Sequence, residues 1–256
     1  MTLVAANQPK VDFLVAGVQK GGTTALFDYL REHPDLLLAD VKEVHFFDNE
    51  NVDWQKPNYE SYHARFTPPT DGRPRLWGEA TPIYIYWPGC LERIADYNPA
   101  MKLVLVFRDP IERAWSHWRM EYARGAETEP FAWCIREGRH RVNGDPSAPG
   151  HHREFSYVER GFYGAQVQRL LNLFPREQAL FLRSEDLRLS PGRILGRVCD
   201  FLNAPHFSTF EIKESHIGQE VGQDKRISAI DRDYLTELFA CDQLVFLEET
   251  GLSFSK

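Results

Sequence analysis

The chain has 256 residues, 43% of them hydrophobic, which is enough to bury one sizeable core. Its formal net charge of -7 at pH 7 argues against a nucleic-acid partner, because such proteins need a basic face to displace phosphate counterions. No apolar run approaches the roughly 18 residues of a membrane span, and the N-terminus lacks the pattern of a leader peptide. We therefore expect a single domain over residues 1–256, with a local site for any anionic ligand.

The first predicted strand ends in the glycine-rich sequence GVQKGGTT, which begins at Gly17 and leads into a helical pattern. Gly17 and Gly22 keep the glycine spacing of the phosphate-binding loop G-x-x-x-x-G-K-[ST]. Thr23, however, stands at the position of the lysine, and Lys20 lies inside the loop. The sequence therefore predicts a site for a phosphorylated ligand other than ATP.

A strand that turns through glycines into a helix presents backbone N–H groups and the positive helix end to an anion. We expect Gly21 and Gly22 to allow close backbone approach, and Thr23 and Thr24 to cap the helix while donating hydroxyls to phosphate. Lys20 would reach over the bound group. The alternative is an ordinary glycine turn before a capped helix.

A second strand is predicted at residues 103–107, and its end differs from that of an ATPase or kinase. Those enzymes place a carboxylate for Mg²⁺ at the end of a second strand. Here Arg108 follows the strand, and the next helix carries Ser116. These residues predict a second anion site and no metal site, which favours a nucleotide that is phosphorylated at two separate positions.

Short apolar runs that lead into helical patterns recur along the chain, as in a parallel sheet with crossover helices. The pairs are residues 11–17 and 23–33, 102–110 and 111–125, and 178–187 and 190–204. The runs are continuously apolar, as expected for strands that are covered on both faces. We therefore predict an α/β domain with a central parallel sheet flanked by helices.

The four cysteines, Cys90, Cys134, Cys199 and Cys241, form no C-x-x-C pair and have no zinc-ligand spacing with histidine. We interpret them as buried or inert thiols. This interpretation predicts a reducing, cytoplasmic location.

In its motifs and their order, the chain resembles sulfotransferases that use 3′-phosphoadenosine 5′-phosphosulfate (PAPS), most closely the heparan sulfate N-/3-O-sulfotransferase type. The likeness lies in the two strand–helix segments above and in KEVHFFD, ERGFYGAQVQRLLNLFP and QDKRIS, which begin at residues 42, 159 and 223. It covers nearly the whole chain. The resemblance implies a P-loop-like fold shared with nucleoside kinases, PAPS as donor and 3′,5′-adenosine bisphosphate (PAP) as product. It also implies an acceptor hydroxyl or amine on a glycan or small molecule, and no metal.

The resemblance also implies roles for particular residues. Lys20 would neutralise charge on the departing phosphate, while Arg108 and Ser116 would bind the 3′-phosphate. Lys225 and Arg226 would close over the nucleotide from a C-terminal loop. The implied nucleotide-binding residues are Lys20, Gly21, Gly22, Thr23, Thr24, Arg108, Ser116, Tyr163, Lys225 and Arg226.

Two residues compete for the role of base that removes the acceptor proton. The resemblance points to Glu43, whose pKa a partly apolar pocket would raise. His45 is the rival, because neutral imidazole is a good base near pH 7; the alternative is that it is structural. If this stretch is extended, both side chains point the same way, and Asp48 would orient a base or bind the acceptor.

The chain departs from the family at several positions. The family's E-K-S-P is replaced by the residues E-A-T-P at 79–82, so a lysine of the active site is absent, and Thr24 stands where 3-O-sulfating members carry arginine. No cysteine pair accompanies the C-terminal lysine and arginine. The aromatic residues 81–88 either line an acceptor cleft or pack ordinarily.

Two other functions compete with sulfuryl transfer. One is a P-loop nucleotide kinase, which the displaced lysine and the missing magnesium carboxylate disfavour. The other is a non-catalytic nucleotide-binding module, which would bind PAP tightly and sulfate no acceptor.

Overall fold

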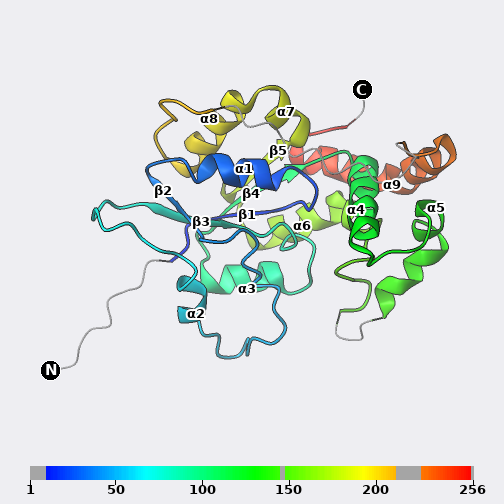
Figure 1. Ribbon diagram of the computed structural model, residues 1–256, viewed down its shortest axis with the longest axis horizontal. Coiled ribbons are helices and arrows are strands. Elements are labelled where there is room, and N and C mark those ends of the chain that lie inside the picture. The colour runs from blue at the N-terminus through cyan, green and yellow to red at the C-terminus, as the bar shows by residue number, and fades with distance from the viewer. Residues whose placement is uncertain (1–9, 145–147, 212–225, 255–256) are drawn as a thin grey trace.

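The computed structural model describes residues 10–144, 148–211 and 226–254. A five-stranded parallel sheet with the order β2-β3-β1-β4-β5 forms its centre (Figure 1). The strands are β1 (Phe13–Gly17), β2 (Leu36–Leu38), β3 (Leu76–Ala80), β4 (Lys102–Phe107) and β5 (Ala179–Arg183). The α-helices of the described ranges are α1 (Thr23–Leu30), α2 (Glu60–His63), α3 (Cys90–Tyr97), α4 (Pro110–Arg124), α5 (Phe131–Cys134), α6 (Tyr163–Leu173), α7 (Ser184–Leu189), α8 (Pro191–Leu202) and α9 (Ala229–Thr250). Short 3₁₀ segments are η1 (Glu137–Asn143), η2 (Glu159–Gly161) and η3 (Arg176–Gln178).

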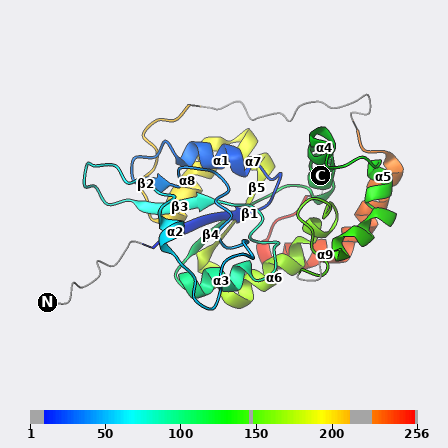
Figure 2. The ribbon, with the colours of Figure 1, turned by 60° about the horizontal axis from the view of Figure 1, so that its bottom comes forward.

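Helices cover both faces of the sheet, as Figures 1 and 2 show from two directions. Alternate side chains of the central strands enter two separate apolar layers, because successive residues of a strand point to opposite faces. Phe13 and Val104 pack with α1, α7 and α8, whereas Leu14 and Leu103 pack with α3 and α6. Burial on both faces explains why these strands are continuously apolar in sequence and confirms the predicted α/β fold.

A further layer of helices lies beyond the carboxyl ends of the central strands. Helices α4, α5 and α9 share an apolar cluster that includes Trp115, Phe131 and Phe239. Figures 1 and 2 show these helices gathered at one end of the sheet. This layer places α4 directly opposite the loop that follows β1.

The three predicted strand–helix pairs are confirmed as β1 with α1, β4 with α4, and β5 with α7 and α8. The third predicted strand was too long, because residues 184–187 form the start of α7. Residues 81–87 are buried, so most of the aromatic segment belongs to the core.

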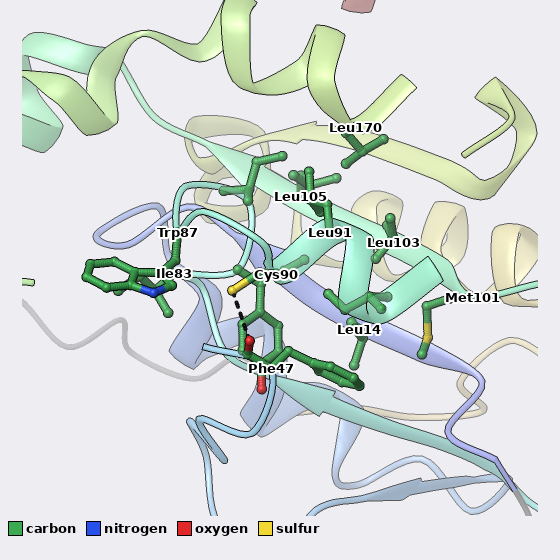
Figure 3. Close-up of a cluster of buried hydrophobic side chains, with 14 of the residues drawn as sticks. Leu14, Phe47, Ile83, Trp87, Cys90, Leu91, Met101, Leu103, Leu105 and Leu170 are labelled. Atoms are coloured by element: carbon green, nitrogen blue, oxygen red, sulfur yellow. Dashed lines mark hydrogen bonds between the residues drawn. The ribbon is translucent and has the colours of Figure 1, made fainter. Parts of the chain in front are cut away.

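The apolar cluster below the sheet anchors the segment that carries Glu43 and His45. Figure 3 shows Phe47 inside this cluster, near Leu91 and Leu14. The Sγ of Cys90 donates a hydrogen bond to the carbonyl oxygen of Phe47, at 3.4 Å. The chain just after the proposed base is therefore fixed to the core.

Candidate active site

The loop after β1 approaches the neighbouring strand closely. A Cβ atom at Gly21 would lie 2.1 Å from the carbonyl oxygen of Val106, so only glycine fits there. Gly22 has φ 96° and is the N-cap of α1 without a side-chain cap, so the predicted threonine cap is wrong. Thr23 is buried and Thr24 exposed. Backbone N–H groups at the start of α1 therefore have no side-chain cap that would compete with an anion.

Lys20 extends from this loop toward α4. Its Nζ lies 3.6 Å from Sδ of Met120. Burial lowers the pKa of Lys20, and the positive charges of Arg124 and Arg108 lower it further. Ser116 is half-buried and stands one turn before Met120, on the same face of the helix. Lys20, Arg108 directly after β4, and this face of α4 therefore converge on one positively charged region.

The end of β4 is held by local caps and by one long-range contact. The carboxylate of Asp109 accepts hydrogen bonds from the first backbone N–H groups of α4, and Pro110 begins the helix. The hydroxyl of Tyr163 donates to the carbonyl oxygen of Arg108, at 2.9 Å, and the side chain is fully buried. The side chain of Tyr163 therefore braces the backbone of Arg108, and its contact with the nucleotide stays a prediction.

The Glu43 segment is not extended, which corrects the prediction from sequence. Glu43 has φ 63° and His45 φ 54°, both in the left-handed region. Backbone hydrogen bonds hold this shape: Glu43 N–H donates to the carbonyl oxygen of Ala80 at 2.8 Å, and Phe46 N–H donates to the hydroxyl of Tyr84 at 3.1 Å. The tight turn still brings the two side chains together.

Glu43, His45 and Asp48 form a chain of charged contacts. His45 Nε2 lies 3.5 Å from Glu43 Oε2, and His45 Nδ1 lies 2.9 Å from Asp48 Oδ2. The guanidinium of Arg153 pairs with the buried carboxylate of Asp48, and Lys42 Nζ lies 2.5 Å from Glu43 Oε1. Asp48 therefore orients the imidazole, while Glu43 and His45 remain 42% and 45% exposed.

These contacts set the charges of the two rival bases. Hydrogen bonding to His45 lowers the pKa of Glu43 to about 2, so the predicted rise is wrong. Hydrogen bonding to Asp48 and then to Glu43 raises the pKa of His45 to about 9. Near pH 7 the pair is a carboxylate beside an imidazolium, because charged partners stabilise each other's charged forms. Only the carboxylate can then accept a proton.

A pocket of about 270 Å³ joins the loop after β1 to this pair. Its lining residues are Gln19, Glu43, His45, Pro82, Ile83, Arg124, Arg153 and Arg160. The pocket thus combines one basic carboxylate with several guanidinium groups, an arrangement suited to an anionic or polar ligand.

Sequence reasoning missed the three arginines of this pocket. Arg160 Nη1 donates to Gln19 Oε1 at 2.5 Å, and its Nη2 donates to the carbonyl oxygen of Arg153 at 2.7 Å. Arg124 and Arg153 are 64% and 44% exposed. Arg160 belongs to the ERG motif noted above, whereas Arg153 lies in a long polar connection with no local signal.

Of the remaining predicted residues, Arg226 is exposed and Lys225 lies outside the described residues. Their contact with a nucleotide stays a prediction. Cys90, Cys134 and Cys199 are buried free thiols, whereas Cys241 is a free thiol that is exposed. In the part of the chain that the structure describes, no group of three His, Cys, Asp or Glu side chains could hold a metal ion, and no helix is long and apolar enough to cross a bilayer.

The parallel sheet has a glycine loop after its first strand and an arginine, Arg108, directly after β4, and a pocket beside it holds a carboxylate. These features define a P-loop-like α/β transferase. The chain belongs to the sulfotransferase domain family, whose sequence model matches residues 10–227.

Several relatives are similar over much of the chain. Membrane-associated sulfotransferase kil1 of Dictyostelium discoideum is 25% identical, over 89% of this chain and 62% of that protein. Human heparan sulfate glucosamine 3-O-sulfotransferase 3B1 is 31% identical, over 77% of this chain and 47% of that protein. The chain therefore spans about half to three-fifths of these relatives' length.

Solved structures share the fold. The crystal structure of a sulfotransferase from Alicyclobacillus acidocaldarius superimposes with a TM-score of 0.77 at 24% identity, covering 96% of this chain and 98% of that one. The sulfotransferase domain from the curacin biosynthetic pathway has a TM-score of 0.53 at 19% identity, covering 79% and 77%. At these identities the likeness is one of fold.

Proposed function

We propose that the protein transfers the sulfuryl group of PAPS to a hydroxyl or amine on a glycan or small molecule. The convergence of the Lys20 loop and the Glu43 carboxylate on one pocket carries this proposal. The residues fit the donor: the glycine loop offers backbone N–H groups, and Arg108 and Ser116 stand nearby for a second phosphate. Family membership adds independent support.

In the proposed reaction, the acceptor oxygen or nitrogen bonds to sulfur while the bond between sulfur and the 5′-phosphate oxygen breaks. The acceptor proton passes to Glu43. The electron pair of the broken bond stays on the phosphate of PAP, where Lys20 stabilises the new negative charge. His45, charged and held by Asp48, fixes the position of the Glu43 carboxylate.

We infer further that the acceptor carries an anionic group near the reacting hydroxyl or amine. Arg124 and Arg153 line the pocket and are partly exposed, so their guanidinium groups can supply positive charge for such an acceptor. An acceptor with a carboxylate should therefore have a kcat/KM about tenfold higher than its methyl ester, as expected for one charge-assisted contact. Initial rates with such a matched pair measure the preference, and equal values would contradict it.

Nucleotide binding distinguishes the proposed sulfotransferase from the alternative of a P-loop kinase, which would prefer ATP. Calorimetry should show PAP binding at least about tenfold more tightly than AMP or ATP, because a charged hydrogen bond to the 3′-phosphate is lost without it. Arg108→Ala should remove this preference. Arg188→Ala, which removes an exposed charge from α7, should leave it unchanged. Equal affinities for ATP and PAP in the unmodified protein would contradict the proposed donor.

A cytoplasmic location stays our prediction, because free thiols are typical of proteins in a reducing compartment.

A further inference from the structure

Glu79, the last residue but one of β3, is a buried carboxyl group with an unusual environment. Five carboxyl-bearing side chains are buried in the described part of the chain: Asp48, Glu79, Glu121, Glu127 and Asp231. Among these, Glu79 alone makes no ion pair with a cation of the described residues; the other four contact arginines. Its neighbours are hydroxyl groups instead. A fully buried carboxyl without a cation calls for an explanation, because its burial costs free energy.

The hydroxyls around Glu79 also hold the segment of the proposed base. Thr81 Oγ1 donates to Glu79 Oε2 at 2.6 Å and accepts from His45 N–H at 3.5 Å. The hydroxyl of Tyr84 accepts from Phe46 N–H at 3.1 Å and is also hydrogen-bonded to Glu79. A hydroxyl has one proton, so donating it to the carboxylate leaves the oxygen lone pairs free for the amide.

We propose that Glu79 is a positioning residue whose ionised carboxylate accepts hydrogen bonds from the hydroxyls of Thr81 and Tyr84. The carboxylate thereby turns both hydroxyl oxygens toward the backbone N–H groups of His45 and Phe46. Each path from Glu79 through one hydroxyl to one backbone N–H is called a relay below. The two relays hold the left-handed turn that places Glu43 against His45. This role rests on the proposed function, in which Glu43 is the base. Glu79 itself does not line the pocket.

The surroundings of Glu79 make its charge sensitive to pH. The titratable groups that act on it are Asp48, Tyr62 and Tyr84, and Tyr62 donates to Glu79 Oε1 at 3.4 Å. Burial raises the pKa of Glu79 to about 7, and the negative charge of Asp48 raises it as well. Glu79 is therefore an ionised carboxylate above about pH 7. Below that pH its added proton is donated to one neighbouring hydroxyl, which then accepts a hydrogen bond from Glu79 where it had donated one.

The imidazole of His45 reports the position of the turn without any acceptor. In the unmodified protein its NMR titration should give a pKa near 9, because both carboxylates are in place. Glu79→Gln keeps the side-chain volume but replaces one carboxylate oxygen by an NH2 group that only donates, so a hydroxyl that faces this group loses its acceptor. We expect the titration of His45 to move down by about one pH unit, the equivalent of one hydrogen bond.

Glu127→Gln is the matched control. Glu127 is also buried and accepts from a tyrosine hydroxyl, that of Tyr157 at 2.9 Å, but it contacts no residue of the 43–48 segment. It should lower stability and leave the titration of His45 unchanged. If Glu79→Gln does not fold, Thr81→Val removes one relay directly and should shift the titration in the same direction.

Kinetics separate positioning from general loss of structure. Glu79→Gln should lower kcat about tenfold with little change in the affinity for PAP. Adding Glu79→Gln to a protein that already carries Thr81→Val and Tyr84→Phe should not lower kcat further, because both relays are then already broken. An unshifted His45 titration in Glu79→Gln, or multiplying effects on kcat, would overturn the proposal. Because the titration needs no transfer, its result is independent of whether the protein sulfates an acceptor.

Discussion

Glu43→Gln is expected to lower kcat by a factor of about 10² to 10⁴, the usual contribution of a positioned general base. The amide keeps the shape of the side chain and cannot take the acceptor proton. Affinity for PAP should stay unchanged, because Glu43 acts on the acceptor proton in the proposed reaction. Steady-state rates and calorimetry measure the two effects. Glu50→Gln, a carboxylate 43% exposed a few residues along the same segment, should keep kcat within about twofold of the unmodified value.

The pH profile distinguishes Glu43 from His45. With a pKa of about 9, a His45 base would become neutral only in alkali, and the rate would rise about fivefold between pH 8 and 9. Glu43, with its pKa lowered to about 2, is ionised throughout this range, so the rate should not rise; it should fall by at most about twofold as His45 loses the charge that positions Glu43. The alkaline rise would transfer the role to His45, as would an equally severe loss in His45→Ala with normal activity in Glu43→Gln.

Lys20→Ala should have the second largest effect. We expect kcat to fall by about 10² to 10³, as for the loss of one preorganised group at developing charge. Affinity for PAP should fall by less than about tenfold, because the charge on the leaving oxygen appears only as the bond to sulfur breaks. Lys20→Arg retains the charge and should recover part of the rate. Equal losses in kcat and affinity in Lys20→Ala would show that the lysine is an anchor only.

The parts of the fold that follow local pattern were predictable from sequence. The segments β1, β4 and β5 are continuous apolar runs that lead into amphipathic helices. Strands β2 and β3 were not predicted. Leu36–Leu38 is too short for a periodic signal, and Leu76–Ala80 is interrupted by Gly78 and Glu79. Both become strands by pairing laterally, β3 with β1 and β2 with β3, which no local window reveals.

The same limit applies to the site. Lys20 and Arg108 follow strands, and their positions were predictable because carboxyl ends of parallel strands meet at one edge. The shape of the Glu43 turn depends on partners more than 30 residues away, among them Tyr84, so the extended prediction failed. The apolar neighbours of Glu43 along the chain predict a raised pKa, whereas the hydrogen bond with His45, which depends on the turn, lowers it.

The most direct measurement is transfer of sulfur label from PAPS to acceptors that carry a hydroxyl or amine, with anionic and neutral members of each class. We predict labelled acceptor in the unmodified protein, undiminished by a metal chelator, and a loss of about 10² to 10⁴ in the Glu43→Gln protein, which still binds PAP. Tight binding of PAP by the unmodified protein without transfer of label to any of these acceptors would contradict the account and leave a nucleotide-binding module.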